Sequence, residues 1–141
     1  MPFIHGRNSA LAIWDSSAAS QLVQGDLNSI SFSWTRDNPE TTTMGKDTKQ
    51  RIAGVRDATV SFAGIWNASA VLGIDTVCSA LMTASTIALL KYYPAGVTTG
   101  CAFYTGCFLL SEYSLQSTLS GAVSVTGTFN MASGSMSAST V

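Results

Sequence analysis

Two stretches of the chain alternate between apolar and polar residues, and both predict half-buried antiparallel strands. Their apolar positions are Ile30, Phe32, Trp34, Val60, Phe62 and Trp66. Serine, threonine or other small residues occupy nearly all of the positions between them. Because successive side chains of a strand point to opposite faces of a sheet, this period predicts strands at about 28–37 and 56–66.

Four further strands are predicted, at about 10–14, 86–93, 101–113 and 121–131. In the last of them the apolar residues lie on one face with Gly127, and serine, threonine and asparagine lie on the other. The apolar residues of this strand are Val123, Val125, Phe129 and Met131. The hydroxyl-rich face suits either a solvent-filled lumen or a polar contact between subunits.

One helix is predicted at about residues 72–83, and 16–24 is typical of a polar turn with a short helical piece. The apolar residues of the longer helix are Ile74, Val77, Cys78, Leu81 and Met82. Their spacing places them on one helical face. A helix this short is marginal alone, so we expect it to pack on the sheet. The predicted fold is mainly β, an antiparallel β-sandwich or partly open barrel with one flanking helix.

The length of 141 residues fits one domain, which we expect to span residues 1–131. Residues 132–141 are mostly serine, alanine and glycine. Such a segment has little apolar bulk to bury, so it predicts a flexible tail.

The connection between the strands at 28–37 and 56–66 is long and charged. Nine of the fifteen Asp, Glu, Lys and Arg residues lie between Arg36 and Asp57. Hairpin loops usually have two to five residues, and longer insertions are typically functional or disordered. We call residues 38–55 the arm and predict that it binds another molecule; a solvated mobile loop is the alternative.

The order of residues through this region resembles the major tail tube proteins of long, non-contractile-tailed bacteriophages. The resemblance is carried by Leu-Asn-Ser-Ile-Ser-Phe-Ser at 27–33, by Glu-Thr-Thr-Thr-Met-Gly at 40–45, and by the strand at 54–66. It covers roughly residues 10–131.

The resemblance implies a virion structural protein: six copies form a ring, rings stack into a tail tube, and DNA passes through the lumen without sequence-specific binding. Implied partners are further copies of the chain, a tape measure protein, a tail terminator and tail-tip proteins. The arm would then cross to a neighbouring subunit or ring. The inter-subunit contact candidates are Arg36, Glu40, Met44, Lys46, Asp47, Lys49 and Arg51.

Composition agrees with an assembly subunit. Charged residues make up 11 % of the chain and apolar residues 46 %, whereas soluble proteins average about 25 % charged. This low charge indicates either an obligate oligomer or a modestly soluble domain. The net charge of −1 includes no basic patch of the kind that nucleic-acid binding requires.

Catalysis, a cofactor and a metal site are not expected. His5 is the only histidine, so acid–base schemes have a single candidate base. The three cysteines show no metal-binding spacing and are odd in number, and we expect them to be buried free thiols, with Cys101 and Cys107 on one strand face. Trp34 and Trp66 are in phase with apolar positions, which favours core packing over a ligand-stacking platform.

Other readings stay open. A monomeric carbohydrate-binding or adhesin-like β-sandwich is one, and a capsid decoration or tail-completion protein is another, as is a tube subunit of a gene-transfer particle or phage-derived bacteriocin. Residues 71–90 are apolar but interrupted by hydroxyl residues, which argues against a membrane span. The N-terminus lacks a signal-peptide profile, so we expect synthesis in the bacterial cytoplasm and a final location in the virion tail.

Overall fold

The computed structural model describes residues 6–14, 20–22, 27–67, 73–84 and 87–140. A short 3₁₀ turn at Gly6–Asn8 comes first. The other elements, in chain order, are β1 (Ala10–Trp14), β2 (Ser20–Leu22), β3 (Leu27–Arg36), β4 (Arg56–Ile65), α1 (Ile74–Ala84), β5 (Ala88–Tyr93), β6 (Ala102–Gln116) and β7 (Ser124–Thr140).

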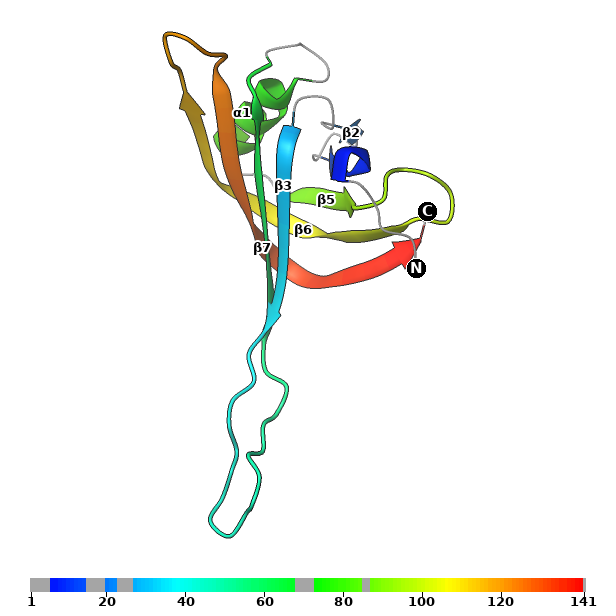
Figure 1. The fold of residues 1–141 in the computed structure, drawn as a ribbon, viewed down its shortest axis with the longest axis vertical. Helices are drawn as coiled ribbons and strands as arrows, with labels where there is room; N and C mark the ends of the chain where they lie inside the picture. The colour runs from blue at the N-terminus through cyan, green and yellow to red at the C-terminus, as the bar shows by residue number, and fades with distance from the viewer. Residues whose placement is uncertain (1–5, 15–19, 23–26, 68–72, 85–86, 141) are drawn as a thin grey trace.

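The described strands form one antiparallel sheet in the order β2-β1-β5-β6-β7-β4-β3. The sheet is strongly curled, so the edge strand β3 returns toward β5 and β6 (Figure 1). The ring of Phe32 in β3 stacks on Tyr92 of β5 at 5.8 Å and on Tyr104 of β6 at 5.3 Å between centroids. Contacts between strands so far apart in the sheet require this curvature. The fold is therefore an open half-barrel, which confirms the partly open barrel predicted from the sequence.

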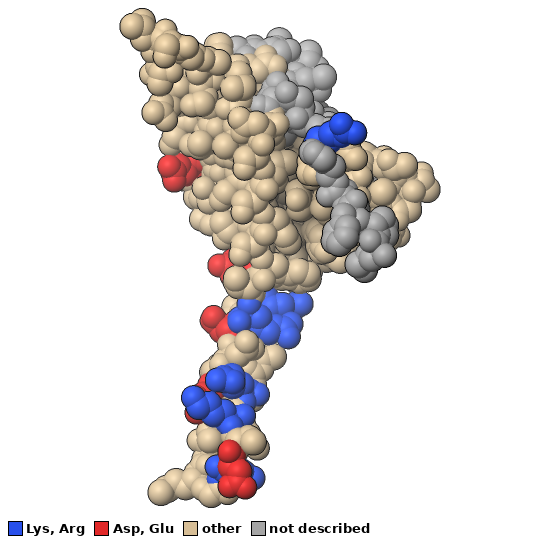
Figure 2. All heavy atoms as spheres, in the orientation of Figure 1, with Lys and Arg blue, Asp and Glu red and all other residues tan. Residues whose placement is uncertain are grey.

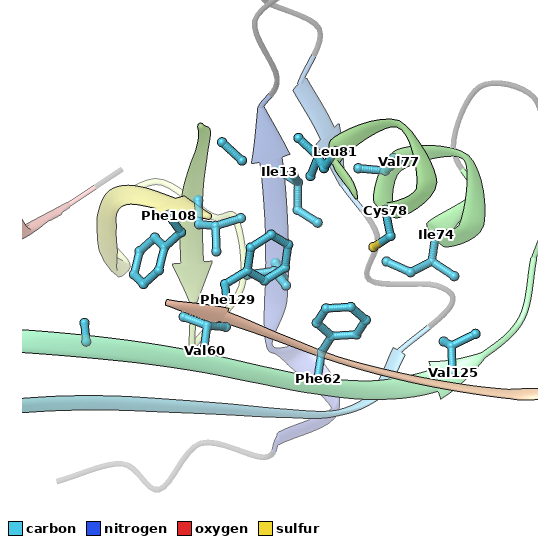
Figure 3. Close-up of a cluster of buried hydrophobic side chains, with 14 of the residues drawn as sticks. Ile13, Val60, Phe62, Ile74, Val77, Cys78, Leu81, Phe108, Val125 and Phe129 are labelled. Carbon is cyan, nitrogen blue, oxygen red and sulfur yellow. The ribbon is translucent and has the colours of Figure 1, made fainter. Parts of the chain in front are cut away.

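The hydrophobic core lies inside the curl, and α1 covers it (Figure 3). The largest fully buried side chains are Leu11, Ile13, Val60, Ile74, Cys78, Leu90, Phe108, Val125 and Phe129. The ring centroids of Phe62 and Phe129, on neighbouring strands, lie 5.8 Å apart. The helix is also held to β6 by a hydrogen bond of 2.8 Å that the Tyr113 hydroxyl donates to Asp75 Oδ1.

Gly127 makes room for the ring of Phe62 in this layer. It is the direct partner of Phe62 in the pairing of β4 with β7. A Cβ atom at position 127 would overlap the Phe62 ring and lie 3.1 Å from the carbonyl oxygen of Glu112. The missing side chain lets the aromatic ring lie flat over the neighbouring strand.

The helix prediction is confirmed for four of its five apolar positions. Ile74, Val77, Cys78 and Leu81 are buried, whereas Met82 is 45 % exposed, so its predicted burial is wrong. At 100° per residue, Met82 lies about 80° around the axis from Ile74, at the edge of the apolar stripe.

The predicted strands all occur, with several bounds shifted by one to three residues and with β7 much longer than predicted. β6 extends to Gln116, beyond the predicted end at 113, and β2 occupies Ser20–Leu22, where a short helical piece was expected. Most of the rest of that segment, 16–24, lies outside the described residues.

The largest difference is at the C-terminus, where a flexible tail was expected and β7 instead continues to Thr140. Its last residues pair with the beginning of β6, with Ser137 opposite Thr105 and Thr140 opposite Ala102. Backbone hydrogen bonds of a ladder do not depend on bulky side chains, so a long partner strand orders even a serine-rich segment. Met136, which is 5 % exposed, adds one apolar anchor to the core.

Candidate inter-subunit surface

The arm is a two-stranded ribbon that projects from the body of the molecule (Figure 1). Its two sides are joined by backbone hydrogen bonds, from Ile52 N to the Pro39 carbonyl at 3.1 Å and from Thr41 N to the Gln50 carbonyl at 2.8 Å. Gly45 turns the chain at the tip with φ of 87°, a left-handed conformation that glycine adopts at little cost. The ribbon is thus regular enough to present its side chains in a defined order.

Figure 2 shows most of the charged side chains on this projection and at its root. The predicted contact candidates lie in the arm, except for Arg36, which ends β3 at its root. Every one of them is exposed: Arg36, Glu40, Met44, Lys46, Asp47, Lys49 and Arg51. Glu40 and Arg51 face each other across the ribbon. Within the described part of the chain, no salt bridge involves the charged residues of the arm. These charges are therefore available to another molecule, and their contact with a second subunit stays a prediction.

Two apolar residues of the arm were missed by the sequence analysis. Val55 is 77 % exposed and Ile52 is 56 % exposed, and Met44 at the tip is 102 % exposed. Isolated apolar residues in a polar segment produce no periodic signal, so no pattern singled out Ile52 and Val55. Their exposure makes the ribbon amphipathic as well as charged.

Arg56 was also missed, and its position at the root of the arm is unusual. It lies directly opposite Arg36 in the pairing of β3 with β4. Like charges facing each other across a sheet are destabilising. With Trp34 and Thr35 the two guanidinium groups line a shallow cleft of about 200 Å³. This arrangement suits a carboxylate supplied by another molecule.

The four strands β3, β4, β7 and β6 carry a second notable surface, which we call the hydroxyl face. Its polar residues include Ser29, Ser31, Ser33, Thr59, Ser61, Thr126, Thr128 and Asn130. Ser111 Oγ donates to the Thr128 carbonyl at 3.0 Å and accepts from Asn130 Nδ2 at 3.0 Å. Among the described residues of this face, the charged ones are Asp57 and Glu112, both acidic.

The predicted core packing of the two tryptophans, Trp34 and Trp66, is wrong. Trp34 is 40 % exposed and Trp66 is 41 % exposed. Trp34 touches Tyr104 edge to face, with 6.4 Å between ring centroids. The two indoles lie at opposite ends of the β3–β4 pair, since Trp34 faces Ala58 and Trp66 follows the end of β4. They do not build a shared stacking platform.

The cysteines behave differently from one another. Burial, together with the nearby Asp75 carboxylate, raises the pKa of the Cys78 thiol to about 12. Cys101 and Cys107 are half-buried, and Cys101 precedes β6, so the expected shared strand face is not formed.

Among the described residues there is no group of three or more metal-ligating side chains, and His5 lies outside them. No helix in the described ranges is long and apolar enough to cross a membrane.

Comparison with known proteins gives matches only at the level of structure. No family model matches the chain, and no curated protein matches its sequence. Solved structures match over nearly its whole length. A chain from the tail of an empty gene transfer agent particle, refined with C6 symmetry, has a TM-score of 0.79 at 14 % identity, covering 96 % of this chain and 98 % of that one.

A chain of the SPP1 tail tube has a TM-score of 0.75 at 7 % identity, covering 92 % of this chain and 76 % of that one. The chain has the tail-tube fold. A chain from the baseplate of the anti-feeding prophage shares this fold, with a TM-score of 0.75 at 10 % identity over 99 % of this chain and 97 % of that one. The tail-tube fold thus extends over nearly all of the chain.

Proposed function

We propose that this chain is a structural subunit of a virion tail tube, in which six copies close into a ring and stacked rings conduct DNA. The observation that carries the proposal is the match of nearly the entire chain to a subunit of a tail with C6 symmetry.

The hydroxyl face is the surface that we assign to the lumen. The opposite face of the same strands is filled by the core and by α1, so it is already covered. If six copies each contribute these four strands, about 24 strands at ~4.8 Å spacing and ~40° tilt give a backbone diameter near 50 Å. Side chains reduce the opening to roughly 40 Å, which admits a DNA duplex.

The chemistry of the hydroxyl face supports passage of DNA. Cationic side chains bind phosphates and release counterions, which would hold the duplex in place. The face carries hydroxyl groups and two acidic residues, Asp57 and Glu112. Such a wall stays hydrated and gives phosphates no strong binding site.

The sheet edges supply a reason for ring closure. β3 and β2 end the sheet, and within the described residues each pairs on one side only. Unpaired edges invite uncontrolled association, and closing a ring of identical subunits removes them. Few charged residues lie on the body outside the arm, which agrees with a surface that is largely covered after assembly (Figure 2).

The arm then links neighbouring copies. Its charges find no salt-bridge partner among the described residues, and the facing Arg36 and Arg56 lack a neutralising group. Mixed charges of this kind set register and orientation between subunits more than affinity. Further partners of such a subunit are a tape measure protein, a tail terminator and tail-tip proteins.

The test is electron microscopy of the purified chain at high concentration, with and without fragments of assembled tails as seeds. We expect tubes with sixfold symmetry and a lumen of roughly 40 Å. Sedimentation velocity on the same samples measures the fraction assembled. Compact single molecules under all of these conditions would contradict the proposed function.

A further inference from the structure

The turn between β6 and β7 presents apolar side chains that the rest of the described chain does not cover. Leu119 is 108 % exposed and Leu115 is 52 % exposed. Trp66, which is 41 % exposed, lies at the base of the same hairpin, where its backbone N–H donates to the Val123 carbonyl at 2.9 Å. We call Trp66, Leu115 and Leu119 the hairpin patch. It contains no charged residue, and none follows Glu112 in the sequence.

Exposed apolar residues concentrated at one place on a low-charge body indicate an interaction site. Leu119 is informative because its side chain is fully exposed and so contributes no packing to this subunit. The fold does not need a leucine here. Serine, threonine or glycine, which are frequent in the neighbouring turn residues, would satisfy the turn equally well.

The arm lies at the other end of the molecule. Figure 1 shows the arm and the β6–β7 turn at opposite ends of the long axis. The arm carries its own uncovered apolar side chains, Val55 and Ile52 along the ribbon and Met44 at its tip. With the long axis of each subunit along the tube, head-to-tail stacking brings the end bearing the arm of one copy to the end bearing the hairpin patch of the next.

We propose that the hairpin patch is the docking site for the arm of a second copy in the adjacent ring. The arm contributes Val55, Ile52 or Met44 to the apolar contact, and its charged residues lie around the rim. This inference rests on the proposed function and adds the surface that receives the arm. Such a contact is heterologous, since two different surfaces meet, and repeating it extends a filament without closing.

The first test compares Leu119→Ser with the neighbouring control Thr118→Ser. Both positions are exposed in the same turn, so both variants should unfold at the temperature of the wild-type chain. Leu119→Ser should raise the concentration needed for half-maximal tube formation about tenfold, as expected for loss of one buried leucine contact. Thr118→Ser should leave that concentration unchanged. Wild-type behaviour of Leu119→Ser would overturn the docking site.

The second test locates the contact directly. Leu119 is replaced by the photo-crosslinking residue p-benzoylphenylalanine, and tubes are assembled from a mixture of isotopically labelled and unlabelled chains. Mass spectrometry should find crosslinks between position 119 of one chain and arm residues 38–55 of another. The same probe at Thr99, exposed in the turn before β6, should not reach the arm.

The outcomes separate the two proposals. Tubes in which position 119 crosslinks only to other segments would overturn the hairpin patch and leave the tail-tube function standing. A wild-type chain that forms no tubes, even with seeds, would overturn the proposed function and this inference with it.

Discussion

Individual residues decide how closely the chain can approach itself. Gly127 leaves room for the Phe62 ring. At the root of the arm, a Cβ atom on Gly54 would lie 2.7 Å from the Asp37 carbonyl oxygen. Cys78 acts in the opposite way, by filling space: it lies on the inner face of α1 and is 0 % exposed. At each of these positions the available space determines the size of the side chain. At Cys78 the fold also suppresses ionisation of the thiol.

The buried thiol predicts a loss of stability in alkali. The pKa of Cys78 is raised from 9.0 to about 12 by burial and by the Asp75 carboxylate. Above pH 9 the thiol ionises in the unfolded chain but not in the folded one. Its contribution to stability is therefore complete below pH 9 and is lost as the pH rises toward 12. At pH 10 the loss is on the order of 1 kcal/mol.

The measurement is the urea midpoint at pH 8 and pH 10. Cys78→Ala should show a smaller decrease between these two values than the wild-type chain. Some decrease should remain, because burial and the hydrogen bond to Asp75 also raise the pKa of Tyr113. Equal decreases in the two proteins would show that the Cys78 thiol is not the group responsible.

Secondary structure elements were predictable where their period was clear. Alternation located β3 and β4, and the spacing of apolar residues located α1. Periodicity could not show where an apolar face ceases to be covered: Trp34 continues the pattern of β3, yet it is 40 % exposed because the core ends before the arm begins. Nor could composition predict that the serine-rich end of β7 has β6 as a partner, since that pairing is a property of the sheet.

Two adjacent residues at the edge of the apolar face of α1 allow a matched test of whether periodicity predicts burial. Leu81 is 4 % exposed and the adjacent Met82 is 45 % exposed, although the sequence placed both on one face. Leu81→Ala should reduce the free energy of unfolding by about 2–5 kcal/mol, because it leaves a cavity between α1 and the sheet. Met82→Ala should cost less than about 1 kcal/mol. Urea denaturation of both variants checks this, and similar costs would place Met82 in the core.

The molecule as a whole consists of a self-contained half-barrel and a projection that contributes nothing to its core. No arm residue belongs to the buried cluster. The sequence predicted this division from charge and loop length, and it predicted the candidate residues. It could not predict that the hairpin patch lies at the end opposite the arm, because residues 66, 115 and 119 come together only after β4, β6 and β7 have paired.

This division predicts that shortening the arm separates folding from assembly. Replacing residues 41–50 by Asn-Gly keeps Glu40 opposite Arg51 and closes the ribbon with a two-residue turn. The variant should have the wild-type unfolding temperature, because the body loses no buried contact. It should fail to form tubes under the electron microscope, since contacts between rings are gone, and should sediment as single subunits or single rings. Thr43→Ser, which preserves the length of the arm, should assemble normally. Normal tubes from the shortened chain would show that stacking depends on the body alone.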